Sequence, residues 1–129
     1  MKTARLMPYL LSVLRIVAGA LYIAHGTSKL FGVPGHPFHP PVFAMTLMFA
    51  AGILETFGGI LMCLGLLTRP VAFVLSGQMA VAFFKQHLPQ SPWPILNGGE
   101  LAVLYCFLWL FFSVAGPGPI SLDALRGKR

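Results

Sequence analysis

Four long apolar runs divide the chain and predict its fold. They cover residues 8–31, 41–67, 70–85 and 95–115, and a short tail, 116–129, follows them. A helix needs about 20 residues to cross the hydrocarbon core of a bilayer. Three runs meet this length, and Lys85 can extend the shorter third run by reaching toward the headgroups; a re-entrant third run is the alternative. We therefore predict an all-α integral membrane protein, a four-helix transmembrane bundle formed by a single domain over residues 1–129.

Composition supports lipid as the main solvent of the chain. Hydrophobic residues make up 57% and charged residues 9% of the sequence, whereas soluble domains carry about 25% charged residues. The first run carries Arg15 and is too long for the apolar core of a signal peptide, so we expect it to be a helix of the protein itself. Cys63 and Cys106 form no CxxC pair and lie inside apolar runs, which argues against a disulfide or zinc framework.

The basic residues predict the orientation of the helices. The formal net charge is +6, but lysines and arginines lie mostly at segment ends, which fits membrane topology better than nucleic-acid binding. An N-terminus in the cytoplasm leaves only Lys29 and Lys85 at the outer ends. It places the other basic residues of the termini and turns inside, namely Lys2, Arg5, Arg69, Arg126, Lys128 and Arg129. We therefore expect a multi-pass protein of the plasma (inner) membrane with both termini cytoplasmic.

Two charged residues lie inside predicted membrane helices and are functional candidates, because a charge in hydrocarbon is costly. Arg15 shares a helical face with Gly19 and Tyr22, and Glu55 is flanked by small residues that allow close helix contact. From their predicted depths we expect Arg15 and Glu55 to pair. Such a pair can serve to fix helix register, or it can act as a catalytic group that transfers protons or contacts a quinone.

Further polar residues are predicted to gather at the outer end of the bundle. The cluster comprises His25, Lys29, Lys85, His87 and Glu100. It can bind an anionic substrate or a polar quinone head. Glu100 has a second interpretation, as part of a capping box in which Asn97 caps the fourth helix. Gln78, midway along the third run, is a substrate-binding candidate or a hydrogen-bonding group between helices.

The tail has its own local pattern. Ser121 can cap a short helix that contains Asp123, and we expect this helix to anchor the C-terminus against the turn at Thr68–Arg69. The sequence contains no CxxCH haem motif, no glycine-rich nucleotide loop and no P-loop, and it has 3 acidic residues in total. We therefore expect no metal, haem or nucleotide cofactor.

Taken in order, these residues resemble the DoxX family of small membrane proteins. The resemblance rests on several short segments spread over nearly the whole chain: Arg15 and Gly19, His25-Gly26, Lys29, Glu55, Gly58-Gly59, Gly65 to Arg69, Asn97 to Glu100, and Gly116 to Asp123. It implies a four-helix membrane bundle. Relatives in the family include a subunit of a thiosulfate:quinone oxidoreductase and membrane components of complexes that handle oxidative or thiol stress.

Two functions follow from the resemblance and the polar residues together. In the first, the protein is a quinone-linked oxidoreductase subunit, in which Glu55 and Arg15 contact the quinone or its protons. His25, Lys29, Lys85 and His87 then attract a small anionic or thiol donor, and a partner redox protein or a second copy completes the enzyme. In the second, the protein is a non-catalytic membrane scaffold for a partner enzyme, and its charged residues only set helix packing.

Overall fold

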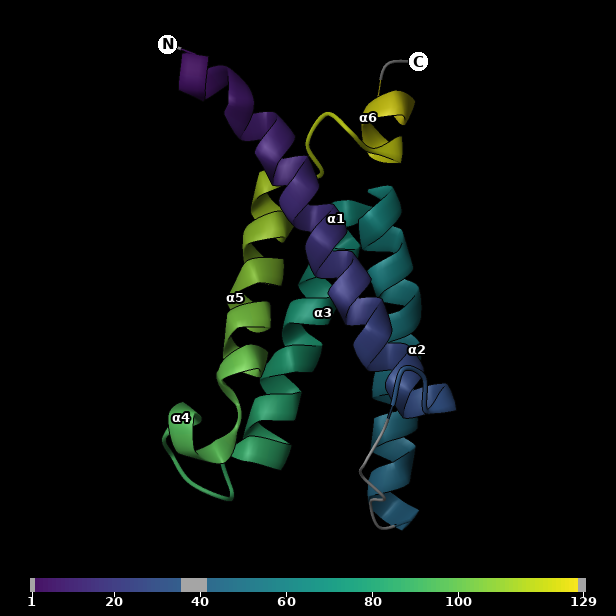
Figure 1. The fold of residues 1–129 in the computed structure, drawn as a ribbon, viewed down its shortest axis with the longest axis vertical. Coiled ribbons are helices and arrows are strands. Elements are labelled where there is room, and N and C mark those ends of the chain that lie inside the picture. The colour runs from purple at the N-terminus through teal and green to yellow at the C-terminus, as the bar shows by residue number, and fades with distance from the viewer. Residues whose placement is uncertain (1, 36–41, 128–129) are drawn as a thin grey trace. The chain divides into compact units, whose positions relative to one another are not determined.

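The computed structural model describes residues 2–35 and 42–127, with side chains described from residue 46 onward after the gap; Pro41, Lys128 and Arg129 lie outside these residues. The described chain is helical and contains no strand, which confirms the all-α prediction (Figure 1). The elements are α1 (Lys2–Phe31), α2 (Val42–Leu64), α3 (Thr68–Ala82), the π-helical turn η1 (Phe83–His87), α4 (Pro94–Asn97), α5 (Glu100–Ala115) and α6 (Leu122–Arg126).

These elements form two compact units. Unit 1 comprises residues 1–68 and 117–129, with the α1–α2 hairpin and the C-terminal α6. Unit 2 comprises residues 69–116, in which α3 and α5 are joined through η1 and α4. The predicted four-helix bundle, which would combine both units, stays a prediction.

Among the described residues, two helices have the length and apolar composition of membrane spans. They are α1, of 30 residues, and Thr46–Leu64 within α2. On α1 the large apolar side chains of Leu10, Val17 and Leu21 are exposed. The helix α5 is also apolar but shorter, with 16 residues.

Several predicted boundaries differ from the structure. The first helix begins at Lys2 rather than Pro8, because the residues before the proline include good helix formers such as Ala4 and Leu6. The fourth run is broken, because Gly98 adopts a left-handed conformation, with φ of 72°, and ends α4 before α5 begins at Glu100. The prediction that Asn97 caps the fourth helix is therefore wrong: Gly99 precedes α5, and no side chain caps it.

Glycines bring α1 and α2 into backbone contact. Gly19 and Gly26 lie seven residues apart on α1 and meet Gly59 and Gly52, which have the same spacing on α2. A Cβ at Gly59 would lie 2.9 Å from the carbonyl oxygen of Gly19. A Cβ at Gly26 would lie 2.5 Å from the backbone nitrogen of Thr56. Any side chain at these positions would push the helices apart, so the glycines set both the spacing and the register of the hairpin.

The C-terminal segment 117–126, here called the strap, folds back onto this hairpin. Ser12 Oγ on α1 accepts a hydrogen bond from the Ile120 N–H at 3.1 Å. Ser121 caps α6 by accepting from the Ala124 N–H at 3.0 Å, which confirms the predicted short helix and its cap. The Asp123 carboxylate accepts from the N–H groups of Leu67 and Thr68, both at 2.9 Å. The tail is thus anchored at the start of α3, as predicted, although the turn itself covers residues 65–67 and Thr68–Arg69 begin the helix.

Asp123 caps a helix that lies 55 residues away in sequence, since Thr68 is the first residue of α3. The N–H groups in the first turn of a helix have no partner within the helix and favour a negative charge. Burial alone would raise the pKa of Asp123, but the backbone hydrogen bonds from Thr68 and Leu67 outweigh it, and the pKa lies below its usual value. The ionised carboxylate therefore stabilises the fold.

We predict that Gly26→Ala destabilises the protein by about 1–3 kcal/mol, the usual range for overpacking, because the new methyl group meets the α2 backbone. Thermal unfolding in detergent, followed by circular dichroism, measures the effect. The matched control is Gly77→Ala on α3, where a Cβ meets nothing within 4 Å. Equal losses in the two variants would contradict the close contact.

We predict that Asp123→Asn lowers the free energy of unfolding at neutral pH by about 0.3–1 kcal/mol, the usual contribution of a negative charge at the start of a helix. A carboxyl with a lowered pKa contributes stability above its unfolded pKa of about 3.9, and the contribution is lost as the pH falls through the lower folded pKa. The gap between wild type and Asp123→Asn should therefore be constant above about pH 5 and close in stronger acid. Denaturant unfolding across this pH range tests it, and a gap independent of pH would refute the capping role of the charge.

Candidate functional site

Arg15 is fully buried on α1, and backbone carbonyl oxygens surround its guanidinium group. Nε donates to the Met62 carbonyl at 2.7 Å, and Nη2 donates to the Ile120 carbonyl at 2.6 Å and, more weakly, to the Cys63 carbonyl at 3.5 Å. Nη1 donates to the carbonyl of Pro117. The last carbonyls of a helix have no partner within it and carry the negative end of its dipole, so the end of α2 suits a cation. Arg15 therefore joins α1, the end of α2 and the strap.

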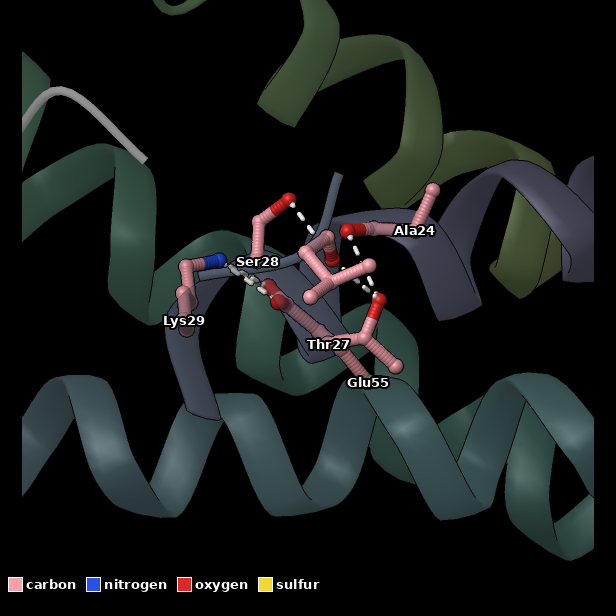
Figure 2. Close-up of polar contacts among 6 residues, drawn as sticks. Ala24, Thr27, Ser28, Lys29 and Glu55 are labelled. Atoms are coloured by element: carbon pink, nitrogen blue, oxygen red, sulfur yellow. Dashed lines mark hydrogen bonds and ion pairs between the residues drawn. The ribbon is translucent and has the colours of Figure 1, made fainter. Parts of the chain in front are cut away.

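Glu55 pairs with Lys29, so the predicted Arg15–Glu55 pair is wrong. Lys29 Nζ lies 2.6 Å from each carboxylate oxygen of Glu55. Dashed lines mark this pair in Figure 2. The Glu55 side chain is 2% exposed and the Lys29 side chain 21%. The pair therefore has a buried acid and a base that reaches the surface of unit 1.

The register of the α1–α2 hairpin explains this choice of partner. Gly19 lies opposite Gly59 and Cys63, and Gly26 lies opposite Gly52 and Thr56, so a residue n on α1 faces about residue 80 − n on α2. Arg15 therefore faces position 65 or so, about ten residues and about 15 Å along the helix from Glu55. Lys29 faces about position 51, one turn from Glu55, and its side chain spans that distance.

Hydrogen bonds at the end of α1 hold the segment that carries Lys29. Thr27 Oγ1 donates to the carbonyl of Val33 at 2.8 Å, and the Gly32 N–H donates to the carbonyl of Ser28 at 3.1 Å. Thr27 Oγ1 also approaches the Ala24 carbonyl, at 3.3 Å (Figure 2). His25 is exposed one turn before Lys29. The end of α1 is thus a closed turn that fixes the base of the Lys29 side chain.

The remaining predicted site residues belong to unit 2. Gln78 on α3 and His87 on η1 are half-buried, whereas Lys85 on η1 and Glu100 in the first turn of α5 are exposed. His87 Nδ1 lies 3.0 Å from the Asn97 carbonyl oxygen. The predicted outer cluster joins residues of both units and stays a prediction. Within units, the structure brings together Lys29 and Glu55, and it places His87 against Asn97.

Asn97 has a structural role that the sequence analysis missed. Its side chain is buried, donates through Nδ2 to the Ser91 carbonyl at 2.7 Å, and accepts through Oδ1 from the Gly99 N–H at 2.7 Å. The asparagine thereby closes the connection between η1 and α5. An asparagine before two glycines indicates such a turn as readily as a helix cap. Across the described residues, no three His, Cys, Asp or Glu side chains group as a metal site would require.

The sequence model of the DoxX family matches residues 10–88, which include Arg15 and both members of the Lys29–Glu55 pair. The chain belongs to the DoxX family. A DoxX protein is a membrane protein, in agreement with the two apolar helices of membrane length. A Haemophilus influenzae protein described as uncharacterized is 41% identical over 128 residues, with 90% of each chain covered. No solved structure matches this DoxX protein.

We predict strong coupling between Lys29 and Glu55. Removing one partner of a buried ion pair costs about 3–5 kcal/mol, and the partial exposure of Lys29 places this pair toward the lower end. Lys29→Met should therefore destabilise the protein, and adding Glu55→Gln should restore part of the loss because the buried charge is then gone. A double-mutant cycle of unfolding free energies in detergent measures the coupling. Additive losses would show that the two side chains act independently.

Proposed function

We propose that this DoxX protein is the membrane subunit of a quinone-linked oxidoreductase, acting with a partner protein on a small anionic or thiol donor. The observation that carries the proposal is the buried Lys29–Glu55 pair on two helices of membrane length. Ionisable groups inside a membrane helix are expensive and are usually kept for transport or proton chemistry. The family resemblance points to quinone rather than to a transported ion.

The proposed arrangement is a four-helix bundle of the plasma membrane with both termini in the cytoplasm. The support is the excess of lysine and arginine at the termini and turns, together with the shorter apolar helix α5 of unit 2. In this orientation Lys29 lies toward the outer end of its helix. Glu55 then lies deeper and is covered by protein, so a quinone dissolved in the bilayer would reach the pair from the partly exposed Lys29.

The residues present fit a quinone head. The Lys29 ammonium group is a hydrogen-bond donor that suits a quinone carbonyl oxygen, and the Glu55 carboxyl can hold or release a proton beside it. When bound, a quinone would take up two electrons from the donor together with two protons. In the proposal Lys29 orients the head, and Glu55 moves a proton between the head and the surface at which Lys29 emerges. Arg15, held by backbone carbonyls, keeps the hairpin and strap together and acts as a positioning residue.

The donor is proposed to approach from the cationic outer side. His25 is exposed one turn before Lys29 in unit 1, and Lys85 is exposed in unit 2, so each unit exposes a basic side chain that can attract an anion. The sequence has no metal or flavin motif that could carry electrons. The partner would therefore accept or deliver them. His87, Gln78 and Glu100 remain candidates for donor or quinone contacts.

We predict that quinone copurifies with the wild-type protein and is lost in Glu55→Gln and Lys29→Met, because these variants remove the proton carrier and the hydrogen-bond donor. The measurement is extraction and quantification of quinone from protein purified in native-lipid discs, followed by quinone-dependent oxidation of thiosulfate and of small thiols. A general-acid role of Glu55 corresponds to a rate loss of about 10²–10⁴-fold in Glu55→Gln.

Asp123→Asn serves as the matched control, since it changes an acid to its amide in the same unit and lowers stability without touching the ion pair. It should keep wild-type quinone content per folded protein. Quinone at the bulk-lipid level in every variant would refute the redox site. In that case the saturated hydrogen bonding of Arg15 favours the alternative function, a non-catalytic membrane scaffold for a partner enzyme.

A further inference from the structure

Both acidic side chains of unit 1 are turned to internal partners. Of the 3 acidic residues in the sequence, Glu55 and Asp123 belong to this unit. Glu55 is paired with Lys29, and Asp123 accepts hydrogen bonds from the N–H groups of Leu67 and Thr68. Both carboxylates are therefore engaged inside the unit. Asp123 also attracts Arg126, which lies in the same short helix.

The basic residues of unit 1 divide by burial. Arg15 is buried against carbonyl groups, whereas Lys2 and Arg5 on α1 and Arg126 on α6 are exposed. The strap is bonded to Ser12 and Arg15, so α6 and the start of α1 lie at the same end of unit 1 (Figure 1). Lys2, Arg5 and Arg126 are here called the cationic end. The acid beside it, Asp123, is half-buried, and its two oxygens already accept hydrogen bonds from Leu67 and Thr68.

Exposed apolar side chains accompany these cations. Leu6 is 56% exposed directly after Arg5, and Leu125 is 61% exposed directly before Arg126. Asp123 holds α6 through its hydrogen bond from Leu67, and Leu125 of the same helix stays exposed. A surface that contacts only water gains no stability from large apolar residues exposed next to its charges. Cations beside apolar side chains are typical of segments that lie at the surface of a bilayer.

We infer that the cationic end binds anionic phospholipid headgroups, with Lys2, Arg5 and Arg126 on the phosphates and Leu6 and Leu125 in the upper acyl region. Lipid is favoured over a protein partner because the apolar surface continues from Leu6 along α1 through Leu10, Val13 and Val17, the exposed side of a helix of membrane length. The lipid that covers this side ends in headgroups at the level of the first turn of α1. The inference does not depend on the proposed redox function.

The test is lipid binding by the full-length protein in a non-ionic detergent, measured by native mass spectrometry with dioleoyl phosphatidylglycerol and dioleoyl phosphatidylcholine. We expect tighter binding of phosphatidylglycerol. Each basic residue near an anionic surface contributes about fivefold, so Arg5→Gln and Arg126→Gln should each reduce the preference by up to about fivefold. Raising the salt to about 0.5 M should weaken the preference of the wild type.

The matched control is Arg126→Lys, which keeps the positive charge at the same exposed position of α6. It should leave most of the preference intact, and binding of phosphatidylcholine with unchanged helicity verifies that each variant is folded. Equal affinity of the wild type for both lipids would overturn the inference and leave the cationic end to a protein partner. So would an equal loss in Arg126→Lys and Arg126→Gln, because charge would then not account for the preference, or competition by free glycerol phosphate, which indicates a soluble anion.

Discussion

The backbone contact between α1 and α2 determines where every charged group of unit 1 lies. Gly19 and Gly26 meet Gly59 and Gly52 so closely that no side chain fits between the helices. In a membrane the hydrophobic effect does not drive helices together, so close packing and hydrogen bonds must do so. Glycines at a spacing of seven residues provide that packing along one face, and they leave a single register in which the two helices fit.

That register gives Arg15 and Lys29, the two cations of the hairpin's packed face, different environments. Arg15 meets the end of α2, where carbonyl oxygens lack helical partners, and the strap adds the carbonyls of Pro117 and Ile120. Lys29 lies near the other end of α1 and reaches the only acid that α2 contains, Glu55. Arginine, with its planar fork of donors, suits several carbonyls at once, whereas lysine concentrates its charge on one carboxylate. The Lys29–Glu55 pair and the carbonyl groups around Arg15 are thus two separate sites of unit 1.

The sequence was sufficient to predict the features that depend on local pattern. Helical content, the apolar faces and the Ser121 cap follow from composition and from residues within one or two turns of each other. The partner of Glu55 could not be predicted in this way, because matching residues by depth ignores how the helices slide along one another. Gly19, Gly26, Gly52 and Gly59 contain that information, but their pairing across the hairpin has to be known before it can be used. Asn97 was misassigned for a related reason: its partners in the turn, Ser91 and Gly99, are set by the left-handed Gly98.

The strap shows how an end of the chain can govern the interior of a small membrane protein. Its carbonyls complete the hydrogen bonding of Arg15, and its one carboxylate caps α3 at Thr68. Without the strap, Arg15 would keep the carbonyls of Met62 and Cys63 but lose the remaining acceptors, and a buried cation with unfilled donors is costly. Because Asp123 is consumed in capping, the same fold that satisfies Arg15 internally leaves Arg126 as an exposed cation. One segment of ten residues, 117–126, therefore sets both the hydrogen bonding of Arg15 and the exposed charge of Arg126. A change in one should alter the other.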